Sequence, residues 1–282
     1  MPLVSIVDEL RRARAGGYAV PCFNAFDLLG ARGIVDALET ARAPGMVAVY
    51  SGVLDQPGPR ALADAIRALA AEATVPVSLS LDHGASYEHC IRALAMGFTD
   101  VMYDGSKLPV EENAATTRQV VRAAHAVGAG VEAELGIVGD GGSYQSFGAR
   151  QEGFTDPEVA ARFVADTGVD FLAVAVGTAH GHYQGEPHLD LDLLERIAAR
   201  VAVPLSLHGG SGLTEAQFRA AAASAVGKIS IFTDLATEAS RRLVEVARGK
   251  EASYFALTRQ VREAFRDRCL YHLELFGAAG KA

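Results

Sequence analysis

The chain has 282 residues, of which 50% are hydrophobic and 21% are charged, a balance typical of a folded globular protein with a large core. Its formal net charge is −8 and it carries no basic stripe, so nucleic acid is not an expected partner. The sequence shows neither a signal-peptide core nor an apolar run of membrane-spanning length, and we expect a cytoplasmic protein. Three cysteines without a C-x-x-C pair argue against a disulfide framework and a cysteine-ligated zinc site.

Eight short apolar runs occur along the chain, and most are followed by a longer, alanine-rich amphipathic stretch. Their near-continuous hydrophobicity predicts strands that are buried on both faces. The sixth run is expected to extend to residues 177–181. The eight runs begin at Ala19, Met46, Val75, Thr99, Ala129, Val169, Val203 and Gly227.

The stretches between the runs predict helices, most clearly at residues 61–73 and 159–167. Asp156 followed by Pro157 is a typical helix start. Eight strand-then-helix units predict one (β/α)₈ TIM barrel, an α/β fold, over residues 1–282, with a C-terminal helical extension at residues 254–276. The alternative, a doubly wound open sheet, lacks a glycine-rich dinucleotide fingerprint after its first strand.

In a (β/α)₈ barrel the active site lies at the carboxyl ends of the strands. Three of the predicted strand ends carry a histidine beside a glycine: His83, His180 and His208. Three neutral imidazoles with one open position form a ligand set of catalytic zinc, although a lone histidine there is more often a hydrogen-bonded rim residue. Asp82 could transfer protons near such a metal if the strand end bends, or it could cap the helix that begins near Ser86.

Glycine-rich segments supply two further candidate features. Residues 208–212, with Ser211, offer backbone N–H groups before a helix that begins at Thr214, and Thr233 at the next strand end could join them. This pattern indicates a phosphate cradle, although a plain glycine turn is the alternative. The long segment 136–155 is expected to be either an active-site lid or a solvent-exposed loop.

Six motifs in fixed order resemble those of the class II, zinc-dependent fructose- and tagatose-bisphosphate aldolases, and most closely the tagatose-bisphosphate-aldolase-like branch. The resemblance implies a cytoplasmic homodimer or homotetramer that reversibly cleaves a ketose 1-phosphate or 1,6-bisphosphate to dihydroxyacetone phosphate and an aldehyde. The motifs are N-A-F-D at residues 24–27, S-L-D-H-G at 80–84, V-M-Y-D-G-S at 101–106, E-A-E-L-G at 132–136, G-T-A-H-G at 177–181 and L-H-G-G-S-G at 207–212.

The resemblance also implies roles for individual residues. His83, His180 and His208 would hold the catalytic Zn²⁺, and Asp82 would be the general acid and base. Asp104 and Glu134 match positions that bind a second metal or a monovalent cation in some members. Substrate contacts would come from Asn24, Ser51, Gly181, Gly209, Gly210, Ser211, Ser230, Thr233 and Arg259, the last donated by a neighbouring subunit.

Zinc would stabilise the negative charge that develops when the carbon–carbon bond breaks, so no lysine Schiff base is needed. Lys228, the one lysine in a predicted strand, is therefore interpreted as a strand-start residue. His182 is interpreted as a rim residue. In the C-terminal extension, Leu270, Leu273 and Phe276 could form a seam toward another copy or pack on the chain's own barrel.

Two departures from the family pattern concern the substrate. Ser230, with Phe232 nearby, stands where the family usually has asparagine, and the loop lacks an acidic pair between Asp140 and Glu152. The ketose therefore need not be fructose or tagatose bisphosphate, and Arg150 or Arg259 could bind a distal anion. The loop between the two acids holds Tyr144, Gln145, Ser146 and Arg150.

The alternatives to the aldolase function are a zinc-assisted sugar-phosphate isomerase or epimerase and a non-catalytic sugar-phosphate-binding partner subunit.

Overall fold

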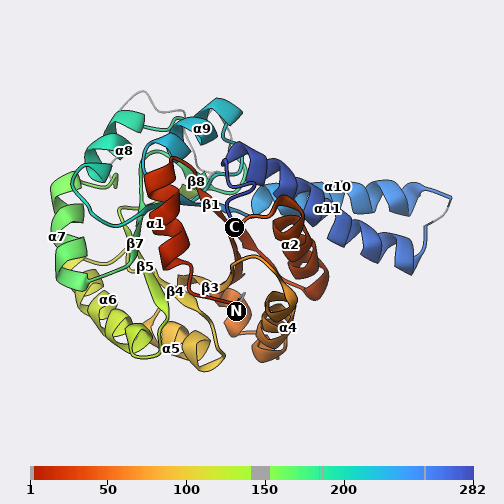
Figure 1. The fold of residues 1–282 in the computed structure, drawn as a ribbon, viewed down its shortest axis with the longest axis horizontal. Helices are drawn as coiled ribbons and strands as arrows, with labels where there is room; N and C mark the ends of the chain where they lie inside the picture. Colours follow the sequence, from red (N-terminus) through yellow and green to blue (C-terminus); the bar gives the residue numbers. More distant parts are fainter. Residues whose placement is uncertain (1–2, 141–152, 184, 186, 251) are drawn as a thin grey trace.

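The computed structural model describes residues 3–140, 153–183, 185, 187–250 and 252–282. Its central feature is a closed barrel of eight parallel strands with helices around it (Figure 1). The strand order is β1-β10-β9-β7-β5-β4-β3-β2, so the first and last strands pair and close the barrel. The predicted barrel is confirmed. Its strands are β1 (Val20–Asn24), β2 (Gly45–Tyr50), β3 (Val77–Gly84), β4 (Asp100–Tyr103), β5 (Gly130–Leu135), β7 (Phe171–Val174), β9 (Leu205–Leu207) and β10 (Val226–Ile231).

Helices alternate with the strands, as the amphipathic stretches predict. The two clearest expectations, at residues 61–73 and 159–167, correspond to α4 and α7. Asp156 caps α7 by accepting hydrogen bonds from the backbone N–H groups of Glu158 and Val159, both at 2.9 Å. The helices are α1 (Val7–Gly16), α2 (Leu28–Ala41), α3 (Ser51–Leu54), α4 (Pro59–Glu72), α5 (Tyr87–Ala95), α6 (Val110–His125), α7 (Pro157–Thr167), α8 (Leu191–Ala198), α9 (Glu215–Ala223), α10 (Thr233–Arg248) and α11 (Tyr254–Leu275).

The sixth predicted strand differs from the expectation. The barrel strand β7 ends at Val174, and the chain then turns at Gly177, whose φ is +104°. A Cβ atom at Gly177 would collide with the carbonyl oxygen of His188, so the turn requires glycine. Beyond the turn, β8 (Ala179–His180) pairs in parallel with β6 (Gly139–Asp140), outside the barrel. His180 therefore lies on a separate short strand and not on a barrel strand.

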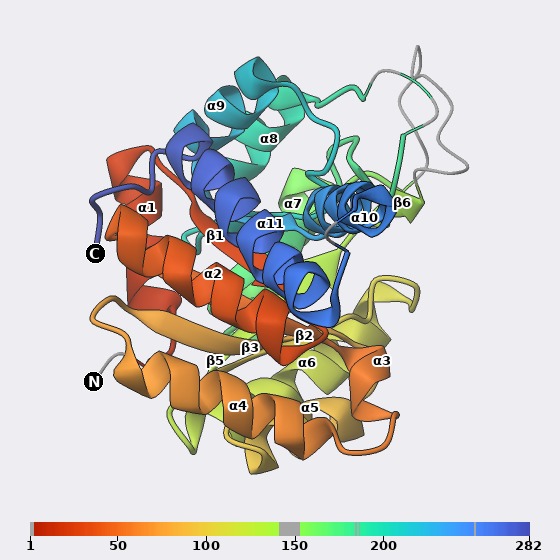
Figure 2. The ribbon, with the colours of Figure 1, turned by 90° about the vertical axis from the view of Figure 1, so that its right-hand side faces the viewer.

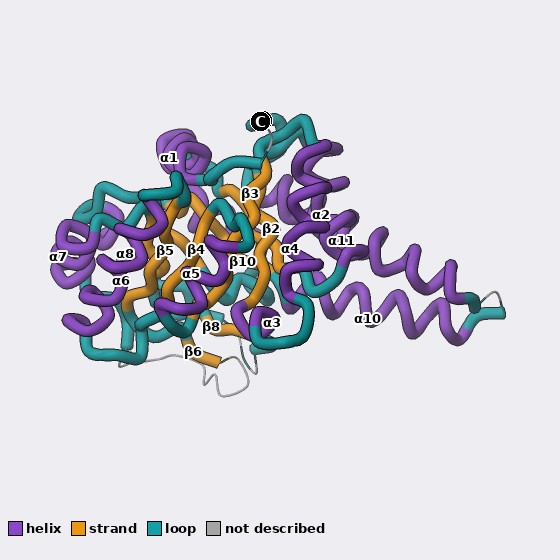
Figure 3. Tube along the Cα trace, turned by 90° about the horizontal axis from the view of Figure 1, so that it is seen from below, coloured by secondary structure: helices purple, strands orange, loops and turns teal. Residues whose placement is uncertain are grey.

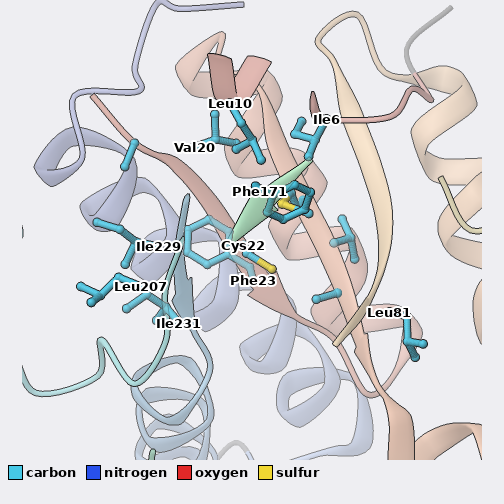
Figure 4. Close-up of a cluster of buried hydrophobic side chains, with 14 of the residues drawn as sticks. Ile6, Leu10, Val20, Cys22, Phe23, Leu81, Phe171, Leu207, Ile229 and Ile231 are labelled. Atoms are coloured by element: carbon cyan, nitrogen blue, oxygen red, sulfur yellow. The ribbon is translucent and has the colours of Figure 1, made fainter. Parts of the chain in front are cut away.

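The barrel interior is filled with side chains. All described positions of β1, β5, β7 and β10 are buried, which agrees with strands covered on both faces. Figure 4 shows this packing, with Phe23 from β1 and Ile229 from β10 near Leu207 from β9. The three cysteines are buried free thiols within the apolar core.

Asp100 closes the amino-terminal end of the barrel beneath α1. Its carboxylate accepts hydrogen bonds from the Ser5 hydroxyl at 2.8 Å, the Ser78 hydroxyl at 2.5 Å and the backbone N–H of Ile6. Burial raises the pKa of Asp100 to about 7 although these hydrogen bonds oppose the shift. Figure 3 shows α1 at one end of the barrel and the β6–β8 pair at the other, so this carboxylate lies far from the rim that bears the histidines.

The C-terminal helices form an arm, defined here as α10 and the amino-terminal part of α11. The two helices run antiparallel and extend away from the barrel (Figures 1 and 3). Farther along, α11 crosses α2, where Gly33 lies so close that a Cβ atom would be 2.9 Å from Cβ of Phe265 (Figure 2). Leu273 and Phe276 are buried, so the chain's own core covers them. None of the described helices has both the length and the apolarity needed to cross a membrane.

Candidate active site

A cavity of about 1030 Å³ opens at the carboxyl ends of the strands. Closure of the barrel brings residues from distant parts of the chain to this one rim. The cavity lies next to the predicted histidines and next to most of the other predicted site residues. From the predicted set it is lined by Asn24, Ser51, Asp82, His83, Asp104, Glu134, His180, Gly181, His208, Gly209, Ser211, Ser230 and Thr233.

Three imidazoles converge in this cavity. The ring centroid of His83 lies 4.9 Å from that of His180 and 4.7 Å from that of His208. One nitrogen of each ring lies within 4.8 Å of the others, a spacing that one metal ion can bridge. Burial lowers the pKa of His180 to about 3, so this ring is neutral and offers a lone pair. Its Nε2 is buried and has no hydrogen-bond partner among the described residues.

Two of the three rings are oriented by carboxylates. Nδ1 of His83 donates to Asp104 at 2.8 Å, and Nε2 of His208 donates to Glu132 at 2.9 Å. Each bond leaves the other ring nitrogen, Nε2 of His83 and Nδ1 of His208, able to bind a metal. Metal-binding histidines usually make such a bond through their second nitrogen. The arrangement thus has the donor set that a bound metal requires.

A backbone bend places Asp82 and His83 in the same cavity. On a regular strand these neighbours would point to opposite faces. In β3 the register with β4 shifts between Leu81 and Gly84, and His83 has a φ of +49°, in the left-handed region. A non-glycine residue in this region costs about 1–3 kcal/mol, and such strain is common at functional sites. The sequence identified the need for a bend but did not give its position or form.

Asp82 is held by a single amide. Nδ2 of Asn24 donates to Oδ2 at 2.7 Å, whereas Oδ1 is buried without a hydrogen-bond partner among the described residues and lies 3.9 Å from Nε2 of His83. Burial would raise the pKa of Asp82, but the electrostatic effects of His83, His208 and Lys228 and the hydrogen bond from Asn24 outweigh burial and lower it. The N-cap of α5 is Ser86, so the alternative helix-capping role for Asp82 is wrong.

A second acidic group adjoins His83. Oε2 of Glu134 lies 3.7 Å from Nδ1 of His83 and has no hydrogen-bond partner within the described part of the chain. Burial and the negative charge of Asp104 raise the pKa of Glu134 to about 8. Burial would also raise the pKa of Asp104, but hydrogen bonds from His83 and Ser106 hold it below its usual range. The carboxylates of Asp104 and Glu134, beside His83, could hold a second cation.

Gly209, Ser211 and Thr233 of the predicted phosphate cradle line the same cavity as the histidines. Gly209 has a φ of +69°, and a Cβ atom there would collide with the carbonyl of Ala179, so the close approach of the two loops requires glycine. The hydroxyl of Ser211 accepts from the backbone N–H of Asp234 at 3.2 Å, in the first turn of α10. Gly210 is the exception within this segment, because it packs against Ile231 and does not line the cavity.

The carboxylate of Asp234 fastens this first turn to α11. It accepts hydrogen bonds from Nε of Arg268 at 2.5 Å and from Nε2 of His272 at 2.7 Å. His272 is buried, and its ring lies edge-on to the ring of Phe218. The amino-terminal end of α10 is therefore fixed in place by the helix that crosses α2.

Comparison with known proteins shows the family of the chain. The sequence profile of the family described as fructose-bisphosphate aldolase class-II matches residues 4–281. The chain belongs to the class II fructose-bisphosphate aldolase family. It is therefore a class II aldolase, a carbon–carbon lyase that cleaves a phosphorylated ketose to dihydroxyacetone phosphate and an aldehyde.

Individual relatives cover nearly the whole chain. A probable fructose-bisphosphate aldolase of Bacillus subtilis is 36% identical over 287 residues and covers all of both chains. The fructose-bisphosphate aldolase of Thermus caldophilus is 39% identical over 306 residues, covering 99% of this chain and 100% of its own. The crystal structure of the YdjI aldolase of Escherichia coli K12 superimposes with a TM-score of 0.89 at 34% identity, over 99% of each chain.

Three further predicted residues of this aldolase have defined surroundings. Arg259 lies exposed on the arm, 3.7 Å from Glu263, and does not line the cavity of its own chain. Nε2 of His182 lies 3.3 Å from the Thr237 hydroxyl on α10, at the rim. The hydroxyl of Ser230 faces the cavity and has no hydrogen-bond partner among the described residues.

Two further predictions for this aldolase concern the aromatic rim and the loop. Phe232 stands beside Ser230 at the cavity, as its sequence position indicated, and its ring packs on that of Phe26 with centroids 4.7 Å apart. The predictions for the loop, which concern the Asp140 side chain and residues 141–152, fall outside the described residues.

Sequence reasoning missed two supporting groups of this aldolase. The hydroxyl of Tyr183 accepts from the backbone N–H of Ala179 at 2.8 Å and donates to the carbonyl of Gly209 at 2.7 Å, joining the two loops that carry His180 and His208. The expectation that Lys228 only begins a strand is wrong, because Lys228 is buried and donates to Glu132 at 2.7 Å. Local sequence patterns predict neither interaction, because each joins segments that meet only in the folded barrel.

Replacing Tyr183 with phenylalanine tests the bridge between the two loops. The change leaves a buried N–H and a buried carbonyl without partners, and the expected loss is about 1–3 kcal/mol of unfolding free energy, measured by urea denaturation of the metal-free protein. Tyr254→Phe is the matched control, because this ring is 75% exposed on the arm. Equal stability of the two variants would contradict the structural role of the Tyr183 hydroxyl.

Proposed function

We propose that this aldolase cleaves a ketose 1-phosphate or 1,6-bisphosphate with a zinc ion held by His83, His180 and His208 and with Asp82 as the acid and base. One observation carries the proposal: three imidazoles and one carboxylate oxygen without a partner converge in a cavity that also holds the phosphate cradle. Three histidines with one open position are a ligand set of catalytic zinc.

The residues present fit a metal ion. Nε2 of His180 and Oδ1 of Asp82 are buried without partners among the described residues, and an unpaired buried polar atom costs about 1–3 kcal/mol. A cation among the rings would satisfy the nitrogen and attract the carboxylate. When bound there, zinc supplies a Lewis acid that stabilises negative charge on the oxygens of the ketose.

Asp82 moves the proton in this proposal. Asn24 holds Oδ2, which leaves Oδ1 to take the proton of the hydroxyl group on the carbon that becomes the aldehyde. As that proton leaves, the electron pair of the breaking carbon–carbon bond passes to the three-carbon fragment, which is released as dihydroxyacetone phosphate after it gains a proton. In the reverse direction Asp82 returns the proton to the aldehyde oxygen.

The remaining lining residues bind the substrate. Gly181, Gly209, Ser211 and Thr233 would hold the phosphate of the dihydroxyacetone half, since α10 begins at Thr233 and a helix amino terminus attracts anions. Asn24, Ser51 and Ser230 would contact the sugar hydroxyls, and Gly210 would support the cradle from behind. We also propose that Asp104 and Glu134 bind a second metal or a monovalent cation beside His83.

The part of the ketose beyond the dihydroxyacetone phosphate half would be selected by the outer wall of the cavity. A cavity of about 1030 Å³ lies at the upper end of the range for small-molecule sites and leaves room beyond a three-carbon phosphate. Ser230 is shorter than the asparagine usual in the family, and the paired rings of Phe26 and Phe232 form part of the same wall. These features favour a ketose other than fructose or tagatose bisphosphate.

We further propose that the whole chain forms one barrel domain and assembles as a homodimer or homotetramer through its arm. Tyr254 and Phe255 are 75% and 81% exposed at the arm, an unusual position for two large apolar rings in a monomer. Assembly through the arm would also bring Arg259 near another copy, where its guanidinium could bind the distal anion of the substrate.

Substitutions separate metal binding from proton transfer. We expect His180→Ala and His208→Ala to lose zinc and activity together, and Asp82→Ala to keep stoichiometric zinc while kcat falls by about 10²–10⁴-fold. Metal content by atomic emission and the rate of dihydroxyacetone phosphate release are the two measurements. His182→Ala, two residues from a proposed ligand, is the control and should retain both. The proposal would be contradicted if the three single alanine variants at His83, His180 and His208 all retained stoichiometric zinc.

A substrate panel tests the reaction itself. Ketose 1-phosphates and 1,6-bisphosphates are assayed for release of dihydroxyacetone phosphate, with and without a chelator, and release should stop when the metal is removed. Consumption of a ketose phosphate without this product would favour an isomerase or epimerase. Zinc binding with no turnover of any compound would favour a sugar-phosphate-binding subunit, and either outcome would overturn the proposed reaction.

Assembly through the arm is tested by molar mass in solution. Light scattering should give the mass of two or four chains, and replacing Tyr254 and Phe255 together with serine should shift it toward one chain, because exposed apolar rings lose their partner surface. Val127→Ser, at a residue that is 69% exposed on the barrel, is the control and should leave the mass unchanged. A monomeric wild-type protein would contradict the proposal.

A further inference from the structure

A buried ion pair lies directly behind one of the proposed zinc ligands. Nζ of Lys228, on β10, donates to both oxygens of Glu132, on β5, at 2.9 and 2.7 Å. The same Oε1 lies 2.9 Å from Nε2 of His208, which follows β9. Each of these side chains is 1% exposed, so water cannot replace any of the contacts. Neither Lys228 nor Glu132 belongs to the described lining of the cavity.

The contacts select one tautomer of the His208 ring. Nε2 has two neighbours, Oε1 of Glu132 at 2.9 Å and Nζ of Lys228 at 3.2 Å. If Nε2 carried no hydrogen, the ammonium could donate to it at 3.2 Å, but its lone pair would still face the lone pairs of Oε1 at the shorter distance of 2.9 Å. If Nε2 carries the hydrogen, it donates to Glu132, and the ammonium can turn its own hydrogens toward the carboxylate. The second arrangement leaves Nδ1 without a hydrogen, directed away from the ion pair.

Lys228 fixes the carboxylate that selects this tautomer. A buried carboxylate is costly unless a charged group pairs with it. Because the ammonium occupies both oxygens of Glu132, the carboxylate has one orientation, and in that orientation Oε1 faces His208. Lys228 and Glu132 lie on two barrel strands, and His208 is the first residue after β9, so the barrel framework sets the distances among the three groups.

We propose that Lys228 and Glu132 are positioning residues that hold His208 with its Nε2–H on Glu132 and its Nδ1 toward the metal. This inference rests on the proposed function, since it concerns one ligand of the proposed zinc site. Lys228 thus acts through Glu132 and His208 and touches neither substrate nor metal. The alternative is that the pair only stabilises the barrel, as the Asp100 cluster does at the opposite end.

The affinity for zinc separates the two roles. Lys228→Met and Glu132→Gln remove the charges at nearly constant volume, and the dissociation constant of Zn²⁺ is measured by competition with a chromophoric chelator. We expect zinc binding to weaken by about 10–100-fold in each, the usual effect of losing a group that orients a metal-binding histidine. The double variant should lose little more than either single variant, because the two residues act as one unit.

Asp100→Asn is the matched control. It also replaces a fully buried carboxyl group on a barrel strand, and it should lower the stability of the metal-free protein while leaving the dissociation constant of Zn²⁺ unchanged. If Lys228→Met and Glu132→Gln behave like this control, the pair is only structural and the positioning role is overturned. A wild-type protein that binds no zinc would instead overturn the proposed function.

A measurement on the wild-type protein does not depend on the folding of any variant. The protein is labelled with ¹⁵N-histidine and loaded with ¹¹³Cd²⁺, and nitrogen–cadmium couplings identify the coordinating atoms. We expect one of the three coupled rings to coordinate through Nδ1 and to show an Nε2–H proton that exchanges slowly with water. Coordination of all three rings through Nε2 would overturn the inference.

Discussion

The structure depends on the pairing of its first strand with its last. β1 meets β10 in parallel, with Val20 beside Lys228, and this contact closes the sheet on itself. All eight strands are parallel, and closure gathers their carboxyl ends into one ring, so Asn24, Asp82 and His208 reach one rim although up to 184 positions separate them in the sequence. An open sheet of the same strands would leave its edge strands apart, and no single cavity could collect these groups. The chemistry of the rim follows from the topology of the barrel.

A closed barrel also imposes a constraint, because polar groups at its rim are largely removed from water. The molecule meets this constraint by pairing: Asn24 holds Asp82, Asp104 holds His83, and Glu132 holds His208. Among the described residues, four side chains that have a buried, unpaired polar atom line the same cavity, namely Asp82, Glu134, His180 and Ser230. These unpaired polar atoms are therefore available at the place where a metal and a substrate are proposed to bind.

The sequence predicted the barrel and most residues of the rim because both leave local signals. Buried parallel strands read as continuous apolar runs, and the histidines stand beside glycines at the ends of such runs. What the sequence could not give depends on geometry between strands. The turn at Gly177 moved His180 to a separate short strand, and the positive φ of His83 brought Asp82 into the cavity. Lys228 looked like an ordinary strand residue, because its partner Glu132 lies 96 positions away on a strand that does not pair with β10, and only the closed barrel brings the two together.

The helix α10 connects the rim of the barrel to the tip of the arm. It begins at Thr233, at the rim, and its 16 residues span about 24 Å to Arg248, near the tip of the arm. Its first turn is fixed to α11, since Arg268 and His272 both donate hydrogen bonds to Asp234 in that turn. The proposed phosphate cradle and the arm therefore lie at opposite ends of one rigid helix, so a displacement of the tip is transmitted to the N–H groups of the first turn of α10.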